Sequence, residues 1–128
     1  MAIYNYFIKG NPEDWGKPNI NFPEKTNYYH VIKHAKLLAT ISFESLHNDR
    51  PIINKPIIVE ATFVFNPPIN RKKRFCTDYP PITNMLQFVY DCAERAGVIK
   101  SKNLIIEEKA IKVYGELTGV DLRMKSYE

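Results

Sequence analysis

The longest alternation of apolar and polar residues lies in the middle of the chain, between Pro56 and Asn66. One side of this stretch carries Ile57, Val59, Ala61, Phe63 and Phe65, and the other carries Ile58, Glu60, Thr62 and Val64. Successive side chains of a β-strand point to opposite faces of its sheet, so a period of two predicts a strand here. Pro67-Pro68 follows and ends it.

Three further segments also predict strands. Ile3 to Lys9 is rich in Tyr, Phe and Ile and stops at Gly10-Asn11-Pro12, after which Glu13 to Pro23 is expected to be a loop. Leu104 to Tyr114 and Val120 to Lys125 are separated by Gly115-Glu116-Leu117-Thr118-Gly119. The glycines at both ends of this connection predict a hairpin between the last two strands.

Two segments show the three- and four-residue spacing of a helix. From Asn27 to about Leu46 the predicted apolar face consists of Tyr28, Ile32, Ala35, Leu38, Ala39, Ser42 and Leu46. Pro51 closes this segment, because proline cannot continue a helix. The second helix is expected from Asn84 to Ala96, with Thr83 as its N-cap and Gly97 as its C-terminal stop.

The predicted elements follow the order β-α-β-α-β-β. A length of 128 residues with 45% apolar side chains suits one hydrophobic core. We therefore expect a single α+β domain over residues 1–128, in which a mixed sheet packs with two helices.

The composition of the chain predicts the cellular compartment and the class of ligand. Cys76 and Cys92 are the only cysteines and no zinc-finger spacing is present, which favours a reducing, cytoplasmic environment. The chain has neither a leader-like N-terminus nor about 18 consecutive apolar residues, so we expect no membrane partner. Eighteen Lys and Arg against fourteen Asp and Glu give a net charge of +4, a modest excess compatible with a polyanionic ligand.

Basic residues are concentrated in one short run, Arg71-Lys72-Lys73-Arg74. Such a run is suited to phosphate, because arginine and lysine donate charge-assisted hydrogen bonds to phosphate oxygens. We expect Lys100 and Lys102 to lie near this run, and Lys17 to be another contact. Trp15 is a candidate for stacking on a base, although a lone tryptophan more often packs in a core.

The middle of the chain resembles a known enzyme family. The residues that carry this resemblance are Tyr79-Pro80-Pro81-Ile82-Thr83-Asn84-Met85-Leu86, then Tyr90-Asp91-Cys92-Ala93, then Ala96-Gly97-Val98-Ile99. They resemble the signature of the RusA family of Holliday junction resolvases, which reads approximately Lys-Pro-Asp-Ile-Asp-Asn-Leu, a helix with Asp-Ala-Leu, then Gly and Asp-Asp-x-Gln. Gly10-Asn11-Pro12 and Lys17-Pro18 also resemble the family's N-terminal pattern.

The resemblance implies a homodimer that binds four-way DNA junctions and cuts them with Mg²⁺. Cutting a phosphodiester in this way needs carboxylates that hold the metal, which activates water and neutralises charge on the phosphate. In this chain Pro81 and Thr83 occupy the positions of the paired aspartates, and Ser101 and Lys102 those of the later acidic pair. Gln87 replaces the family's basic residue on the helix, and only Asn84 is retained.

These replacements leave three hypotheses open. The first is a RusA-like protein that binds branched DNA and no longer cleaves it, with no cofactor required. The second is an active Mg²⁺-dependent nuclease whose metal is held by shifted carboxylates. The third is a protein-interaction or dimerisation module without DNA binding. The candidate shifted carboxylates are Asp78, Asp91, Glu107 and Glu108, which fit solvated turns and helix faces equally well.

Histidine and cysteine suggest no second active site. His30 and His34 have the i, i+4 spacing of a metal pair but lack a glutamate partner, so they and His47 are interpreted as surface residues. Cys92 is expected to pack in the core, and Cys76 has no catalytic His context.

Overall fold

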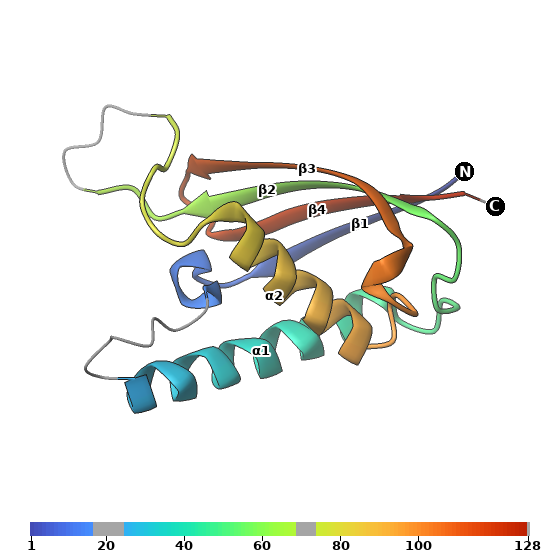
Figure 1. Ribbon diagram of the computed structural model, residues 1–128, viewed down its shortest axis with the longest axis horizontal. Helices are drawn as coiled ribbons and strands as arrows, with labels where there is room; N and C mark the ends of the chain where they lie inside the picture. The colour runs from blue at the N-terminus through green and yellow to red at the C-terminus, as the bar shows by residue number, and fades with distance from the viewer. Residues whose placement is uncertain (17–24, 69–73, 128) are drawn as a thin grey trace.

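The computed structural model describes residues 1–16, 25–68 and 74–127 and shows an α+β fold with a four-stranded mixed sheet. The two long helices of this part of the chain lie on one face of the sheet (Figure 1). The order β-α-β-α-β-β is confirmed, and two short 3₁₀ helices are added. The elements are β1 (Ala2–Lys9), η1 (Pro12–Trp15), α1 (Lys25–His47), β2 (Ile57–Phe65), α2 (Ile82–Arg95), η2 (Lys102–Leu104), β3 (Ile105–Tyr114) and β4 (Gly119–Ser126).

The strand order is β1-β4-β2-β3, which contradicts the predicted hairpin. β4 and β3 are not neighbours, because β2 lies between them, antiparallel to β4 and parallel to β3. The connection after Tyr114 must therefore cross two strand spacings, about 10 Å, over the end of β2. The Gly115 N–H donates to the Phe65 carbonyl at 2.9 Å as the chain passes. The glycine-bounded segment is thus a crossover rather than a tight turn.

The core lies between the sheet and the helices. β2 contributes its predicted apolar row, which is buried from Ile57 to Phe65. Met85 and Val89 of α2 and Phe43 of α1 cover it and are at most 2% exposed. Burial of each such side chain stabilises the fold by about 1.5–3 kcal/mol, and this packing holds α2 against the sheet.

The buried face of α1 differs from the predicted one. Leu38 and Leu46 are about half exposed, whereas Phe43 and His47, which the spacing left out, are almost fully buried. The prediction was wrong because the helix turns its i, i+4 pair Phe43 and His47 toward Tyr6 on β1, with the Tyr6 and Phe43 rings 5.6 Å apart. Contacts with β1 thus outweigh the local apolar pattern.

α2 begins earlier than predicted. Its N-cap is Pro81, which makes no side-chain capping bond, and Thr83 lies within the first turn, so the prediction of Thr83 as the N-cap was wrong. The end of the helix matches expectation, because Gly97 adopts a positive φ of 77°. Glycine adopts this left-handed conformation without the Cβ penalty, which makes it a common helix terminator.

His47 is a buried residue, so its interpretation as a surface histidine was wrong. The Tyr6 hydroxyl lies 2.7 Å from His47 Nδ1, and Nε2 lies 3.0 Å from the Pro51 carbonyl. The carbonyl can only accept, so Nε2 carries the proton and Nδ1 accepts from Tyr6. Burial raises the pKa of Tyr6 to about 12, an effect that Arg50 partly opposes. This chain of bonds ties the end of α1 to β1.

We expect Tyr6→Phe to lower the free energy of unfolding by about 1–2 kcal/mol, because it leaves the buried His47 Nδ1 without a donor. Urea denaturation measures the change. Tyr4→Phe is the matched control, because Tyr4 stacks beside His47 at a ring distance of 6.2 Å and keeps its ring in the variant. Equal losses in the two variants would contradict the role given to the hydroxyl.

Candidate α2–β3 groove

Three of the positions that resemble the RusA motif lie along one stripe of α2. Thr83, Gln87 and Asp91 recur at four-residue steps, so they share one face of the helix. Beside this stripe lies a hollow of about 390 Å³, named here the α2–β3 groove. It is lined by Gln87, Tyr90, Lys102, Ile105, Ile106, Glu107 and Glu108.

Asp91 lies at the end of this stripe and is neutralised by two lysines. Lys102 Nζ donates to Asp91 Oδ1 at 3.0 Å, and Lys36 Nζ of α1 lies 3.5 Å from Oδ2. The Gln87 amide also donates to Oδ1, at 3.4 Å. These lysine and aspartate side chains keep 32–38% of their surface exposed, so solvent screens the pairs. The carboxylate is occupied by ammonium groups of the chain itself.

Local backbone contacts place Lys102 at this position. After Gly97 the chain returns along the segment before β2, where Lys100 N donates to the Ile53 carbonyl at 3.0 Å. The Lys102 N–H then donates to Glu94 Oε1 of α2 at 2.9 Å. Glu94 therefore anchors the start of η2 to α2, and this contact brings the Lys102 side chain beside Asp91.

Glu108 faces α2 across the groove. The buried Tyr90 hydroxyl donates to Glu108 Oε1 at 2.7 Å. Burial raises the pKa of Tyr90 well above its ordinary value, and the bond to Glu108 and its charge raise it further. Tyr90 thus stays protonated and remains a donor at any physiological pH, which holds the Glu108 carboxylate in place.

The four candidate carboxylates do not form one site. Asp91 pairs with lysines, while Glu107 and Glu108 line the groove. Asp78 lies before α2, in a separate hollow of about 310 Å³ that includes Glu13, Cys76 and Tyr114. In residues 1–16, 25–68 and 74–127, no three His, Cys, Asp or Glu side chains are grouped closely enough to hold a metal ion. The residues present at the motif positions do not suit Mg²⁺, which prefers several oxygen ligands in octahedral geometry.

A further lysine occupies the approach to α2. Lys112 Nζ donates to the backbone carbonyls of Asp78 and Pro80, the latter at 2.7 Å. It also lies 5.4 Å from the centre of the Phe65 ring. This ammonium group holds the backbone just before Pro81 through two carbonyls.

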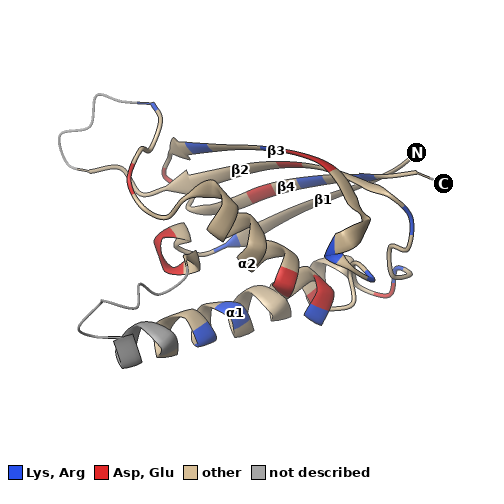
Figure 2. Ribbon diagram, viewed as in Figure 1, with Lys and Arg blue, Asp and Glu red and all other residues tan. Residues whose placement is uncertain are grey.

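The candidate phosphate-binding residues are more widely separated than expected. Arg74 lies beside the end of β3, where its carbonyl accepts from Tyr114 N at 3.1 Å, whereas Lys100 and Lys102 precede the start of that strand. β3 spans about 30 Å, so the expectation that these residues share one pocket was wrong for Arg74. Lys and Arg are spread over both ends of the molecule (Figure 2). Lys17, Arg71, Lys72 and Lys73 lie outside the described residues.

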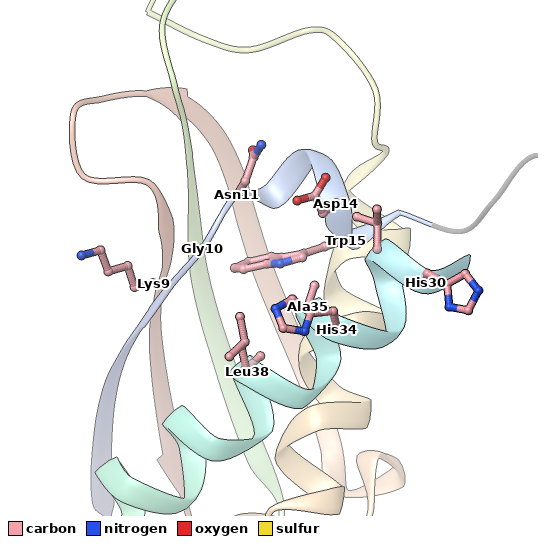
Figure 3. A pocket seen from close by; sticks show the side chains of 11 residues that line it. Lys9, Gly10, Asn11, Asp14, Trp15, His30, His34, Ala35 and Leu38 are labelled. Atoms are coloured by element: carbon pink, nitrogen blue, oxygen red, sulfur yellow. The ribbon is translucent and has the colours of Figure 1, made fainter. Parts of the chain in front are cut away.

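Trp15 is a core residue and not a stacking platform. It is 3% exposed and stacks on Phe88 of α2, with ring centroids 5.1 Å apart and planes at 7°. Its indole also borders a largely apolar hollow of about 370 Å³ between η1 and α1 (Figure 3). In this view His34 lies under the indole while His30 points away, so the two histidines do not form a metal pair.

Both cysteines are buried, as expected for Cys92. Burial raises the pKa of the Cys92 thiol to about 11, an effect that a hydrogen bond with Thr40 and the charge of Lys36 partly oppose. A thiol with a raised pKa is a poor nucleophile at neutral pH. Cys92 therefore contributes packing between α1 and α2.

Sequence reasoning missed Lys36 and Tyr90. Lys36 lies outside the predicted apolar face of its helix, and its partner Asp91 is 55 positions further along the chain. No local pattern reports such a contact. Tyr90 carried a weak signal, because a buried tyrosine normally finds a partner for its hydroxyl.

No protein family matches this chain, and no curated protein is similar to it in sequence. The described part of the chain also contains no helix with the length and apolar character needed to cross a bilayer. The resemblance to RusA proteins therefore rests on the motif residues and on the order of the elements.

We expect Mg²⁺ to leave the thermal stability of the protein unchanged relative to NaCl of equal ionic strength. A folded-state site held at about a hundred times its dissociation constant would add about 2.7 kcal/mol, which a thermal melt detects readily. Lys102→Met is the companion variant, because it removes the closest ammonium group from Asp91. A rise in melting temperature of the unmodified protein with Mg²⁺, abolished by Asp91→Asn, would show that Asp91 holds a metal after all.

Proposed function

We propose that this protein is a RusA-like binder of branched DNA, most suitably four-way junctions, that no longer cleaves its ligand. The order of helices and strands agrees with the family, and Asn84 and Gly97 stand at the family's positions on α2 and at its end. The resemblance to the family suggests branched DNA as the ligand. The side chains at the α2–β3 groove suggest that cleavage has been lost.

The observation that carries the loss of cleavage is the contact between Lys102 and Asp91. Lys102 stands where the family has an acidic residue, and its ammonium group lies 3.0 Å from the carboxylate. A metal-dependent nuclease gathers carboxylates so that their negative charge attracts Mg²⁺. Here the chain supplies two positive charges to the one carboxylate, which removes that attraction.

The nuclease hypothesis has less support. Its four candidate carboxylates lie at three separate places. Asp91 belongs to the ion cluster that it forms with Lys36 and Lys102. Glu107 and Glu108 line the α2–β3 groove, and Asp78 lies in its own hollow. Glu108 is engaged by Tyr90. A shared Mg²⁺ would require Asp78 and Asp91, which lie before α2 and on its third turn, to approach over much of the length of the helix.

Phosphate contact is proposed for exposed cations at two places. Lys100 and Arg95 are exposed, and Arg95 lines a hollow together with Lys36 and Asp91. Arg74 is exposed at the far end of β3, and its guanidinium lies 5.2 Å from the Phe75 ring centre. Two separated positive regions suit a branched ligand, whose arms present phosphates in more than one direction. Lys17, Arg71, Lys72 and Lys73 are proposed to add to these regions.

We expect the protein to bind a four-way junction more tightly than a duplex of the same length, with an affinity that falls steeply as salt rises. Lys100→Ala should reduce the slope of log affinity against log salt by about one, because one phosphate contact is lost. Mobility shifts over a salt series measure both quantities. Lys9→Ala is the matched control, since Lys9 is an exposed lysine at the end of β1, away from α2.

The same samples separate the other two hypotheses. Equal, weak binding of junction and duplex, unaffected by Lys100→Ala and by Arg71→Ala with Lys73→Ala, would favour an interaction module without DNA binding. Junction cutting in Mg²⁺ that stops in Asp78→Asn or Asp91→Asn would overturn the proposed loss of cleavage.

A further inference from the structure

The hollow between η1 and α1 has the size and the walls of a small-molecule site. Its volume of about 370 Å³ lies at the lower end of the range of about 300–1,000 Å³ that such sites occupy. Its apolar walls come from the indole of Trp15 and from four residues of α1, which are Val31, Ala35, Leu38 and Ala39. Val31 is 43% exposed and Leu38 is 51% exposed, so apolar surface is left uncovered here. A ligand that covers this surface is stabilised by the hydrophobic effect.

The hollow extends along α1 and has its charged group at one end. Val31 and Leu38 are seven residues apart, which corresponds to about 10 Å along the helix. In Figure 3 the carboxylate of Asp14 and the side chain of Leu38 lie on opposite sides of the Trp15 indole. A ligand that contacts both residues therefore carries a polar group at one end and an apolar body at the other.

Asp14 supplies a carboxylate that has no partner within the chain. Its side chain is half-buried, and this burial raises the pKa of the carboxyl group above its ordinary value. In the part of the chain that the structure describes, no hydrogen-bond donor and no cation pairs with the carboxylate. Asp91 differs, because Lys36 and Lys102 neutralise it. A cationic ligand would compensate the hydration that Asp14 has lost.

The other ionisable groups of the hollow leave the negative charge of Asp14 in place. Lys9 lines the hollow, but its ammonium group points away from the indole in Figure 3. His30 also points away, and His34 lies on the side of the indole opposite Asp14. An anionic group at the polar end would meet the Asp14 carboxylate and be repelled. Charge at this end of the hollow therefore favours a cation.

We propose that the hollow between η1 and α1 binds a small organic amine with an extended apolar body. The ammonium group pairs with the carboxylate of Asp14, and the body lies along α1 from Val31 to Leu38. The indole of Trp15 borders both parts of the ligand. The inference does not rest on the proposed DNA binding, because the hollow shares no residue with the α2–β3 groove.

The test uses the fluorescence of Trp15, which is the only tryptophan of the chain and borders the hollow. The probe is 4-phenylbutylamine, titrated into the full-length protein at neutral pH, and we expect a saturable change in indole emission. Two other probes separate charge from apolar contact. 4-Phenylbutyrate has the same ring with the opposite charge, and butylamine lacks the ring, so each should bind at least about tenfold more weakly. Equal affinities for the amine and 4-phenylbutyrate, or no saturable change with the amine, would contradict the proposal.

Three variants connect the binding of the amine to the hollow. Asp14→Asn removes the charge and keeps the shape of the side chain, so it should weaken amine binding by about tenfold. Glu13→Gln is the matched control, because Glu13 is the adjacent exposed carboxylate, lies outside the hollow, and should leave the affinity unchanged. Ala35→Leu fills the hollow and should abolish binding.

A thermal melt of each variant shows that it is folded. Full amine affinity in Asp14→Asn or in Ala35→Leu would overturn the proposal, and so would an equal loss in Glu13→Gln. The comparison of the three probes uses the unmodified protein, so it decides the charge preference even where a variant does not fold.

Discussion

The position of β2 between β3 and β4 is the constraint on which the rest of the structure depends. Both edges of this strand are paired, and its row from Ile57 to Phe65 is buried beneath the helices. Because β2 takes the centre, β1 and β3 become the edges of the sheet, and α2 lies beside the start of β3. The α2–β3 groove follows from this arrangement.

The ion cluster formed by Asp91, Lys36 and Lys102 lies on a frame that other residues hold in place. The hydrophobic packing of Met85 and Val89 holds α2 in place whatever residues stand on its polar stripe. Positions on that stripe are free to change, since they contribute little to the core. Lys102 and Lys36 then supply, within the chain, the positive charge that a cation supplies in a metal-dependent nuclease.

Glu108 connects the groove with the outer edge of β3. Its side chain accepts from Tyr90 on the helix side, while its backbone N–H and C=O point outward along the edge of β3. The buried Tyr90 thus holds the side chain of a residue whose backbone lies at the outer edge of the sheet.

Local pattern in the sequence by itself determined the two long helices, the four strands and their order, and most of their ends. Three such signals are the period-two row of β2, the glycine after α2 and the prolines after β2. Each acts on the conformation of neighbouring residues, so it can be interpreted without knowing the fold. Only the tertiary structure decided the strand order, the rotation of α1 toward Tyr6 and the capture of Asp91 by Lys36. These features depend on contacts between residues that are far apart in the chain. The energies of such contacts cannot be inferred from the spacing of neighbouring residues.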